Sequence, residues 1–189
     1  MKLLMAGNEE YGLAKSLKML YPDTVSLSRT TGYDIKKLET KKQIAEMSLD
    51  YDVFFCVSAL GDFHQSLLVE KIMEKWQEKN HSGYLIVLGS SADTPVNGTL
   101  RMYNVEKRAL RAYCRQLSQI AASEKPSNWK VTYVAPGNLH TPNQDAKMPS
   151  TPKLNCDYVA GVISWLLEQP ADINISELCL DRKQLICEK

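Results

Sequence analysis

The chain has 189 residues, of which 44% are apolar and 24% are charged, and its formal net charge is +1. This length suits one hydrophobic core, so we expect a single domain spanning residues 1–189. The sequence has no basic run and no apolar stretch long enough to span a bilayer, which argues against nucleic acid or a membrane as the partner. We expect a cytoplasmic protein that binds a small molecule.

The cysteines and histidines suggest neither disulfides nor a metal. The cysteines are odd in number, widely spaced and mostly in apolar surroundings: Cys56, Cys114, Cys156, Cys179 and Cys187. This pattern favours reduced thiols, and it favours core packing for Cys114 and Cys156. No two Cys or His residues share one face at metal-ligand spacing, so no structural metal is expected.

Short apolar runs alternate with helical patterns along the chain. The runs predict strands at 2–6, 24–28, 52–58, 83–89, 130–135 and 175–181. Helices are expected at 12–20, 62–80, 103–123 and 157–168, with a weak helix after the second strand. In the helix at 103–123 we expect Leu110, Leu117 and Ile120 to face inward. Residues 142–156, which contain three prolines, are expected to form a loop.

The strands are uninterrupted apolar runs, which is typical of strands buried on both faces. Together with the alternating helices they predict a parallel sheet covered on both sides, a Rossmann-like doubly wound α/β fold. Ligands of such sheets bind beyond the carboxyl ends of the strands. The residues found there are small or polar: Gly7 to Gly12, Ser28-Arg29, Ser58 to Gly61, Ser90-Ser91 and Pro136 to Thr141.

Tyr103 and Lys107 form a Tyr-x-x-x-Lys spacing that places a phenol and an ammonium on one helical face. A phenol that titrates near 10 is a poor acid or base at neutral pH, but a neighbouring cation moves its pKa toward the working range. The spacing alone also arises on ordinary helix surfaces. The functional interpretation depends on the residues found before and after this pair along the chain.

Ser90 precedes Tyr103 by thirteen residues, and Pro136-Gly137-Asn138-Leu139-His140-Thr141 ends the next strand. In this order the chain resembles the short-chain dehydrogenase/reductase family, whose pattern is Ser, then Tyr-x-x-x-Lys, then Pro-Gly-x-x-x-Thr. The resemblance implies that Tyr103 transfers a proton and that Lys107 lowers its pKa and contacts the nicotinamide ribose. It also implies that Ser90 or Ser91 orients a carbonyl or alcohol substrate. The thirteen-residue spacing favours Ser90, whereas the strand pattern at residues 86–91 slightly favours Ser91.

The resemblance further implies a dinucleotide site along the strand ends. The residues expected to hold the cofactor are Gly7, Asn8, Gly12, Ser28, Arg29, Thr30, Asp34, Ser58, Ala59, Lys107, Pro136, Gly137, Leu139 and Thr141. Arg29 follows the second strand with no carboxylate at that strand end, which favours NADP(H) over NAD(H). Asp34, a turn further on, is a candidate contact to adenine. Thr141 is expected at the nicotinamide end, although it also suits a turn cap.

The chain departs from the family pattern at two places. The phosphate loop carries Glu9 and Glu10, so either these carboxylates point to solvent while the backbone amides bind phosphate, or cofactor affinity is reduced. The family's helical asparagine is missing, and Phe63 or His64 stands near its place. His64 is then a proton relay, or an exposed helix residue.

The sequence leaves two hypotheses about function and predicts a homo-oligomer. The leading function is an NADP-dependent oxidoreductase, and the alternative is an NADP(H)-binding sensor without turnover. The resemblance also implies a homodimer or homotetramer that pairs the helices at 62–80 and 103–123. In the competing interpretation of the second helix, Leu110, Cys114 and Leu117 are only core residues.

Overall fold

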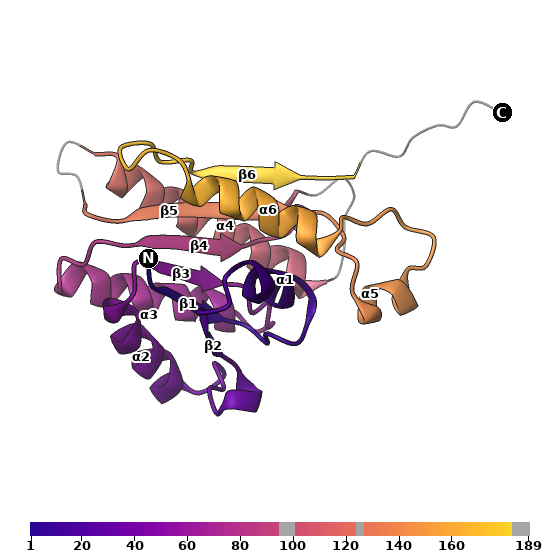
Figure 1. The fold of residues 1–189 in the computed structure, drawn as a ribbon, viewed down its shortest axis with the longest axis horizontal. Helices are drawn as coiled ribbons and strands as arrows, with labels where there is room; N and C mark the ends of the chain where they lie inside the picture. The colour runs from indigo at the N-terminus through magenta and orange to yellow at the C-terminus, as the bar shows by residue number, and fades with distance from the viewer. Residues whose placement is uncertain (95–100, 124–126, 183–189) are drawn as a thin grey trace.

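The structure is a computed structural model, and it describes residues 1–94, 101–123 and 127–182. Within these residues six parallel strands form one sheet in the order β2-β1-β3-β4-β5-β6 (Figure 1). The strands are β1 (Leu3–Ala6), β2 (Val25–Leu27), β3 (Val53–Cys56), β4 (Tyr84–Leu88), β5 (Lys130–Pro136) and β6 (Glu177–Leu180). The predicted Rossmann-like α/β fold is confirmed.

Helices cover both faces of the sheet (Figure 1). They are α1 (Gly12–Leu20), α2 (Leu38–Met47), α3 (His64–Glu78), α4 (Met102–Ala121), α5 (Pro142–Lys147) and α6 (Cys156–Leu167). On one face Ile44, Leu68 and Leu110 bring α2, α3 and α4 into one buried cluster. On the other face Leu17 and Ile163 bring α1 and α6 into a second cluster. The sheet therefore lies between two apolar layers, as its uninterrupted apolar strands require.

The register of the strands aligns their carboxyl ends. Leu4 pairs with Phe54 and Phe54 pairs with Leu85, so buried side chains form a continuous row across the sheet. The chain reverses its strand order at β1, which lies between β2 and β3. Ligands of open α/β sheets bind at such a switch point, beyond the strand ends.

Two expectations about local structure were wrong. The stretch expected as a loop contains α5, because Thr141 accepts a hydrogen bond from the Gln144 amide at 3.3 Å and Pro142 occupies the first helical turn. Ile120 was expected to face inward, but it lies in the last turn of α4 and is 43% exposed. None of the described helices is both long enough and apolar enough to cross a membrane.

Candidate active site and dinucleotide cleft

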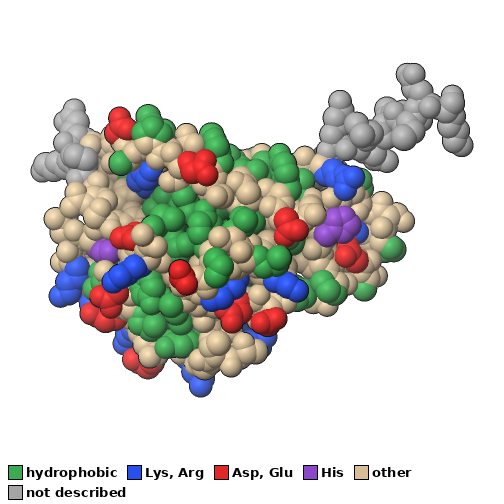
Figure 2. Space-filling view, viewed as in Figure 1, with side chains coloured by type: hydrophobic (Ala, Val, Ile, Leu, Met, Phe, Trp, Pro, Cys, Tyr) green, Lys and Arg blue, Asp and Glu red, His purple; other side chains and the backbone are tan. Residues whose placement is uncertain are grey.

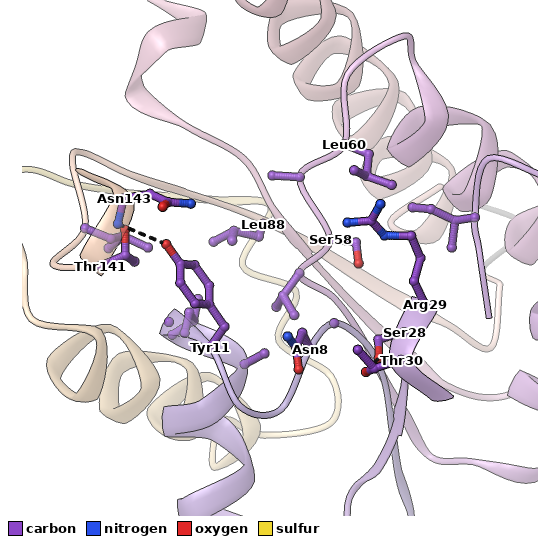
Figure 3. Close-up of a pocket in the computed structure, with 18 of the residues that line it drawn as sticks. Asn8, Tyr11, Ser28, Arg29, Thr30, Ser58, Leu60, Leu88, Thr141 and Asn143 are labelled. Carbon is purple, nitrogen blue, oxygen red and sulfur yellow. Dashed lines mark hydrogen bonds between the residues drawn. The ribbon is translucent and has the colours of Figure 1, made fainter. Parts of the chain in front are cut away.

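A cleft of about 510 Å³ opens at the switch point, beyond the carboxyl ends of β1, β2 and β3 (Figure 3). Ten of the residues predicted to hold the cofactor line it: Gly7, Asn8, Gly12, Ser28, Arg29, Thr30, Ser58, Ala59, Leu139 and Thr141. The sequence analysis missed other lining residues, including Tyr11, Tyr33, Leu60, Leu88 and Asn143. Loops from four separate strand ends therefore meet around one cavity.

Two glycines shape the loop between β1 and α1. A Cβ on Gly7 would overlap the Val57 side chain, so only glycine lets these two segments approach so closely. Gly12 begins α1 with a φ of +54°, in the left-handed region that favours glycine. The residue before it, Tyr11, makes no side-chain hydrogen bond to the helix end. The start of α1 thus has no side-chain cap, and its residues Gly12, Leu13 and Ala14 line the cleft, which suits an anionic phosphate.

The two carboxylates of this loop do not line the cleft. Glu9 lies 3.5 Å from the ammonium of Lys18. Glu10 is exposed, and its backbone amide donates to the side-chain oxygen of Asn8 at 3.2 Å. Neither Glu9 nor Glu10 is among the residues that line the cavity. The loop therefore fits a phosphate group, because the negative side chains stay outside the cavity.

Arg29 extends across the cleft toward Ser58 (Figure 3). It opens the short 3-10 turn η1 (Arg29–Thr31), which follows β2. Ser28 and Thr31 cap this turn reciprocally, and the hydroxyls of Ser28 and Thr30 lie 2.7 Å apart. Within the described parts of the chain no carboxylate pairs with Arg29. The guanidinium is accordingly available to an anionic ligand.

Four predicted cofactor contacts lie outside the cleft lining: Asp34, Lys107, Pro136 and Gly137. The carboxylate of Asp34 accepts the Lys36 amide at 3.1 Å, which closes a local turn. At Gly137 a Cβ would overlap the side chain of Asp181, so this glycine serves the packing between β5 and β6. Thr141 caps α5, as one of its two expected roles requires, and it also lines the cleft; its contact to the nicotinamide end stays a prediction.

Ser90 and Tyr103 meet just beyond β4. The Ser90 hydroxyl accepts the Ala92 amide at 3.2 Å and thereby caps the turn η3 (Ser91–Asp93). Burial raises the pKa of Tyr103, the charges of Glu106 and Asp93 raise it further, and a hydrogen bond with Ser90 acts in the opposite direction. Of the two candidate serines, Ser90 is the one that contacts the phenol.

Lys107 is buried behind Tyr103 and is only 3% exposed. Its ammonium donates to the side-chain oxygen of Gln65 at 2.5 Å and to the carbonyl of Leu88 at 3.3 Å. Burial lowers the pKa of Lys107 to about 8, although Glu106 nearby acts to raise it. The ammonium also lies 5.5 Å from the centre of the Tyr103 ring, so Lys107 adjoins the phenol while its hydrogen bonds go to Gln65 and Leu88.

Gln65 was missed by the sequence analysis, which placed Phe63 or His64 near this position. Gln65 is 2% exposed and contacts Lys107, whereas His64 is half-buried and makes no described contact to Lys107. A signal was present in the sequence. Gln65, Leu68, Ile72 and Trp76 share one face of α3, and an amide in such an apolar stripe is expected to have a specific partner.

The sequence analysis also missed Asp93, a buried residue that is linked to Ser90 through Tyr133. Asp93 is 4% exposed and accepts hydrogen bonds from Tyr133 at 2.9 Å and from Arg111 at 3.1 Å. The Ser90 amide in turn donates to the Tyr133 hydroxyl at 3.4 Å. The residue before Ser90 has to be Gly89, because a Cβ there would overlap the Tyr133 ring. This network fixes the turn that carries Ser90.

The Ser90, Tyr103 and Lys107 cluster adjoins the cleft without lining it. Leu88 connects the two, since its side chain lines the cleft and its carbonyl accepts from Lys107. Elsewhere, three cysteines are buried free thiols and Cys179 is an exposed free thiol, while Cys187 lies outside the described residues. Among the described residues no three His, Cys, Asp or Glu side chains are grouped as metal ligands would be.

Comparison with solved structures relates this geometry to known dehydrogenases. The chain is similar to a 4-hydroxyisoleucine dehydrogenase complexed with NADH, with a TM-score of 0.74, 13% identity and coverage of 96% of this chain and 97% of that chain. A 3-alpha-hydroxysteroid dehydrogenase from a Pseudomonas species, complexed with NADH, gives a TM-score of 0.75 at 17% identity over 96% and 95% of the two chains. A short chain dehydrogenase from Burkholderia cenocepacia in complex with NADP gives 0.72 at 14% identity over 95% and 89%.

Comparison of sequences reaches less far. No protein-family model matches the chain. An uncharacterized oxidoreductase of Staphylococcus epidermidis is 27% identical over 103 residues, which cover 54% of this chain and 44% of that relative. The chain thus matches less than half the length of its curated relative. The likeness to solved structures confirms the resemblance at the level of the fold: this chain has the fold of the short-chain dehydrogenases.

Proposed function

We propose that residues 1–189 form a single-domain, NADP(H)-dependent oxidoreductase of the short-chain dehydrogenase type, which interconverts a carbonyl group and an alcohol. The observation that carries this proposal is the meeting of Ser90, Tyr103 and Lys107 at the carboxyl edge of the sheet, beside a cleft lined by ten predicted cofactor contacts. A phosphate loop alone would support only binding. The phenol of Tyr103, which is 37% exposed, and the buried ammonium of Lys107 support chemistry as well.

Different residues of the cleft would bind different parts of the dinucleotide. The start of α1 suits the pyrophosphate, since it has no side-chain cap. Arg29 suits the 2′-phosphate of NADP(H), because a guanidinium offers paired donors and stays charged at every relevant pH. Leu139 and Thr141 line the far end, where the nicotinamide half belongs. A bound nicotinamide would supply or accept the hydride.

The chain's own residues would handle the proton. A phenol whose pKa is raised stays protonated at neutral pH, so Tyr103 is suited to give its proton to a carbonyl oxygen as the alcohol forms. Ser90 would orient that oxygen through its hydroxyl. Lys107 would stabilise the phenolate that remains and would bind the nicotinamide ribose.

The exposed face of α4 supports a homodimer. Met102 and Val105 are 60% and 50% exposed, and Ala109 and Ala112 continue their stripe. Leu110, Cys114 and Leu117 are core residues and contribute nothing to this face. A second apolar surface lies over α1 and α6, where Tyr158 and Trp165 are exposed (Figure 2), and it could serve a dimer of dimers.

A test of assembly is light scattering at micromolar concentration. A monomer would contradict the proposal. Val105→Glu should dissociate the dimer, or reduce a tetramer to a dimer, because it buries a charge in the contact. The control is Gln119→Glu, at an exposed position of α4, and it should leave the assembly unchanged.

The second candidate function is an NADP(H)-binding sensor without turnover. It is favoured by one observation: the ammonium of Lys107 already donates to Gln65 and to the Leu88 carbonyl. Calorimetric titration with NADPH and NADH, followed by assay with a panel of aldehydes and ketones, separates the two functions. NADPH binding with turnover supports the enzyme, binding without turnover supports the sensor, and failure to bind either dinucleotide contradicts both.

A further inference from the structure

Gln65 joins three elements at one buried point. Its side-chain nitrogen donates to the Cys56 carbonyl at 3.1 Å and to the Leu88 carbonyl at 2.8 Å. Its side-chain oxygen accepts from the Lys107 ammonium at 2.5 Å. The amide therefore links the ends of β3 and β4 and holds the lysine of α4, with both its donors and its acceptor used.

The position of this amide is determined by the fold. Cys56 and Val87 form the last matched pair between β3 and β4, so the Gln65 amide bridges the two strands at the point where their pairing stops. Two bonds to backbone carbonyls leave the side-chain oxygen in one fixed orientation, toward Lys107. A buried amide with all its partners satisfied costs little, whereas one lost partner would leave a polar group unsatisfied.

We propose that Gln65 is the positioning residue for Lys107, and that as a neutral acceptor it sets both the location of the ammonium and the pH range over which it stays charged. Gln65 and Leu88 occupy two of the three ammonium hydrogens. The third is left for a ligand on the side of Tyr103. The relevance to catalysis rests on the function proposed above, but the effect on the lysine does not.

The titratable groups around Lys107 are either uncharged or hydrogen-bonded to other partners. Burial raises the pKa of the Cys56 thiol on β3 to about 12, and it also raises that of the Cys114 thiol on α4, so both stay uncharged. Glu106 on α4 directs its carboxylate to the Asp62 amide at 2.9 Å, and Asp93 on η3 is bonded to Tyr133 and Arg111. Neither carboxylate is hydrogen-bonded to the lysine. Among the described residues, Gln65 is the side chain that accepts a hydrogen bond from the ammonium, and burial lowers the pKa of Lys107 to about 8.

The experiment measures the titration of Lys107 directly, without any dinucleotide. Protein labelled with ¹³C at the lysine ε-carbon is titrated by NMR, and Lys107→Met identifies the resonance. Gln65→Glu replaces the whole amide by a carboxylate, which removes the donors to the Cys56 and Leu88 carbonyls and places a negative charge at the ammonium. It should move the midpoint up by one pH unit or more, a tenfold change in the proton affinity of the lysine. Gln65→Met keeps the volume, removes the acceptor and should move the midpoint down. Gln77→Glu, at an exposed position of the same helix, is the matched control and should change nothing.

The outcomes separate this inference from the proposed function. Midpoints that stay in place in folded Gln65→Glu and Gln65→Met would overturn the positioning role, whether or not the protein binds NADPH. If Gln65→Glu fails to fold by circular dichroism, Gln65→Met alone decides the matter. Midpoints that move in the expected directions support the inference, and absence of NADPH binding in the same samples would then count against the proposed function only. Where NADPH binds, the pH at which its affinity falls should shift in parallel with the lysine.

Discussion

The two halves of the site are built in opposite ways. In the adenosine half, Arg29 is exposed and the start of α1 lines the cleft without a side-chain cap. In the catalytic half, Gln65, Lys107 and Asp93 are each less than 5% exposed. Their side chains are already hydrogen-bonded within the protein, Lys107 to Gln65 and Tyr133 to Asp93. A group that binds a ligand has to stay open, whereas the groups that hold a proton donor in position have to be fixed. We therefore expect changes in the first half to alter affinity, and changes in the second half to alter chemistry or folding.

The largest expected effect is on catalysis. Tyr103→Phe removes the phenol that gives the proton, and it should lower turnover by on the order of 10² to 10⁴ while NADPH affinity stays nearly constant. Steady-state assay and calorimetry on the same preparation test both halves of the comparison. Unchanged turnover would sink the assignment of Tyr103. Lys107→Met should weaken turnover and binding together, and loss of neither would return Lys107 to a structural role.

The next effect is on folding, and it tests how tightly the catalytic half is packed. Gly89→Ala places a methyl group against the Tyr133 ring, which holds Asp93 and Ser90, and it should destabilise the protein by about 1–3 kcal/mol or more. Gly161→Ala is the matched control. A Cβ there meets no atom within 4 Å on α6, so this variant should be neutral or gain up to about 1 kcal/mol. Urea unfolding measures both, and equal stabilities would refute the close packing around Gly89.

A comparable effect, confined to affinity, is expected in the adenosine half. Arg29→Ala removes a charge-assisted hydrogen bond worth roughly 1.5–3 kcal/mol, and it should weaken NADPH binding by about ten- to a hundredfold or more. NADH, which lacks the 2′-phosphate, serves as the control ligand and should bind the variant nearly as well as the wild type. Equal losses for the two dinucleotides, or no loss for either, would show that Arg29 does not read the 2′-phosphate.

The smallest effect concerns the salt bridges behind the catalytic half. Burial raises the pKa of Glu177, but hydrogen bonds from Arg111 and Arg115 outweigh it and hold the pKa at about 2. Because the folded-state pKa is depressed, this stabilisation is complete above the unfolded pKa of about 4.5 and is lost as the pH falls toward 2. After allowance for solvent screening it amounts to about 1–2 kcal/mol. The free energy of unfolding, measured between pH 6 and pH 3, should fall less steeply for Glu177→Gln than for the wild type. An equal pH dependence for the two proteins would contradict the account.

The sequence predicted the open half of the site better than the closed half. Strand ends can be recognised from apolar runs, so Gly7, Arg29 and Ser58 were placed correctly at the cleft. Pro136 and Gly137 are also at a strand end, but β6 covers this end of β5 and the two residues do not line the cleft. The position of a residue along a strand does not show which neighbouring strand covers it.

The closed half depends on contacts between residues far apart in the chain. Gln65 and Lys107 are separated by 42 positions, and Asp93 and Tyr133 by 40, and no spacing pattern links them. That Lys107 lowers the pKa of Tyr103 stays a prediction, and the acceptors that hold its ammonium, Gln65 and Leu88, come from other elements. The apolar stripe of α3 contained the clue to Gln65, but not the identity of its partner.

The central claim is that a dinucleotide phosphate binds in the cleft at the switch point. The most direct test is to follow the backbone amide resonances of the ¹⁵N-labelled protein while NADPH is added. The account predicts that the amides of Gly7, Gly12, Arg29 and Thr141 shift together and saturate at one equivalent per chain. Shifts confined to the opposite edge of the sheet, around Lys2, Asp23 and Tyr51, or no shifts at millimolar NADPH, would contradict it.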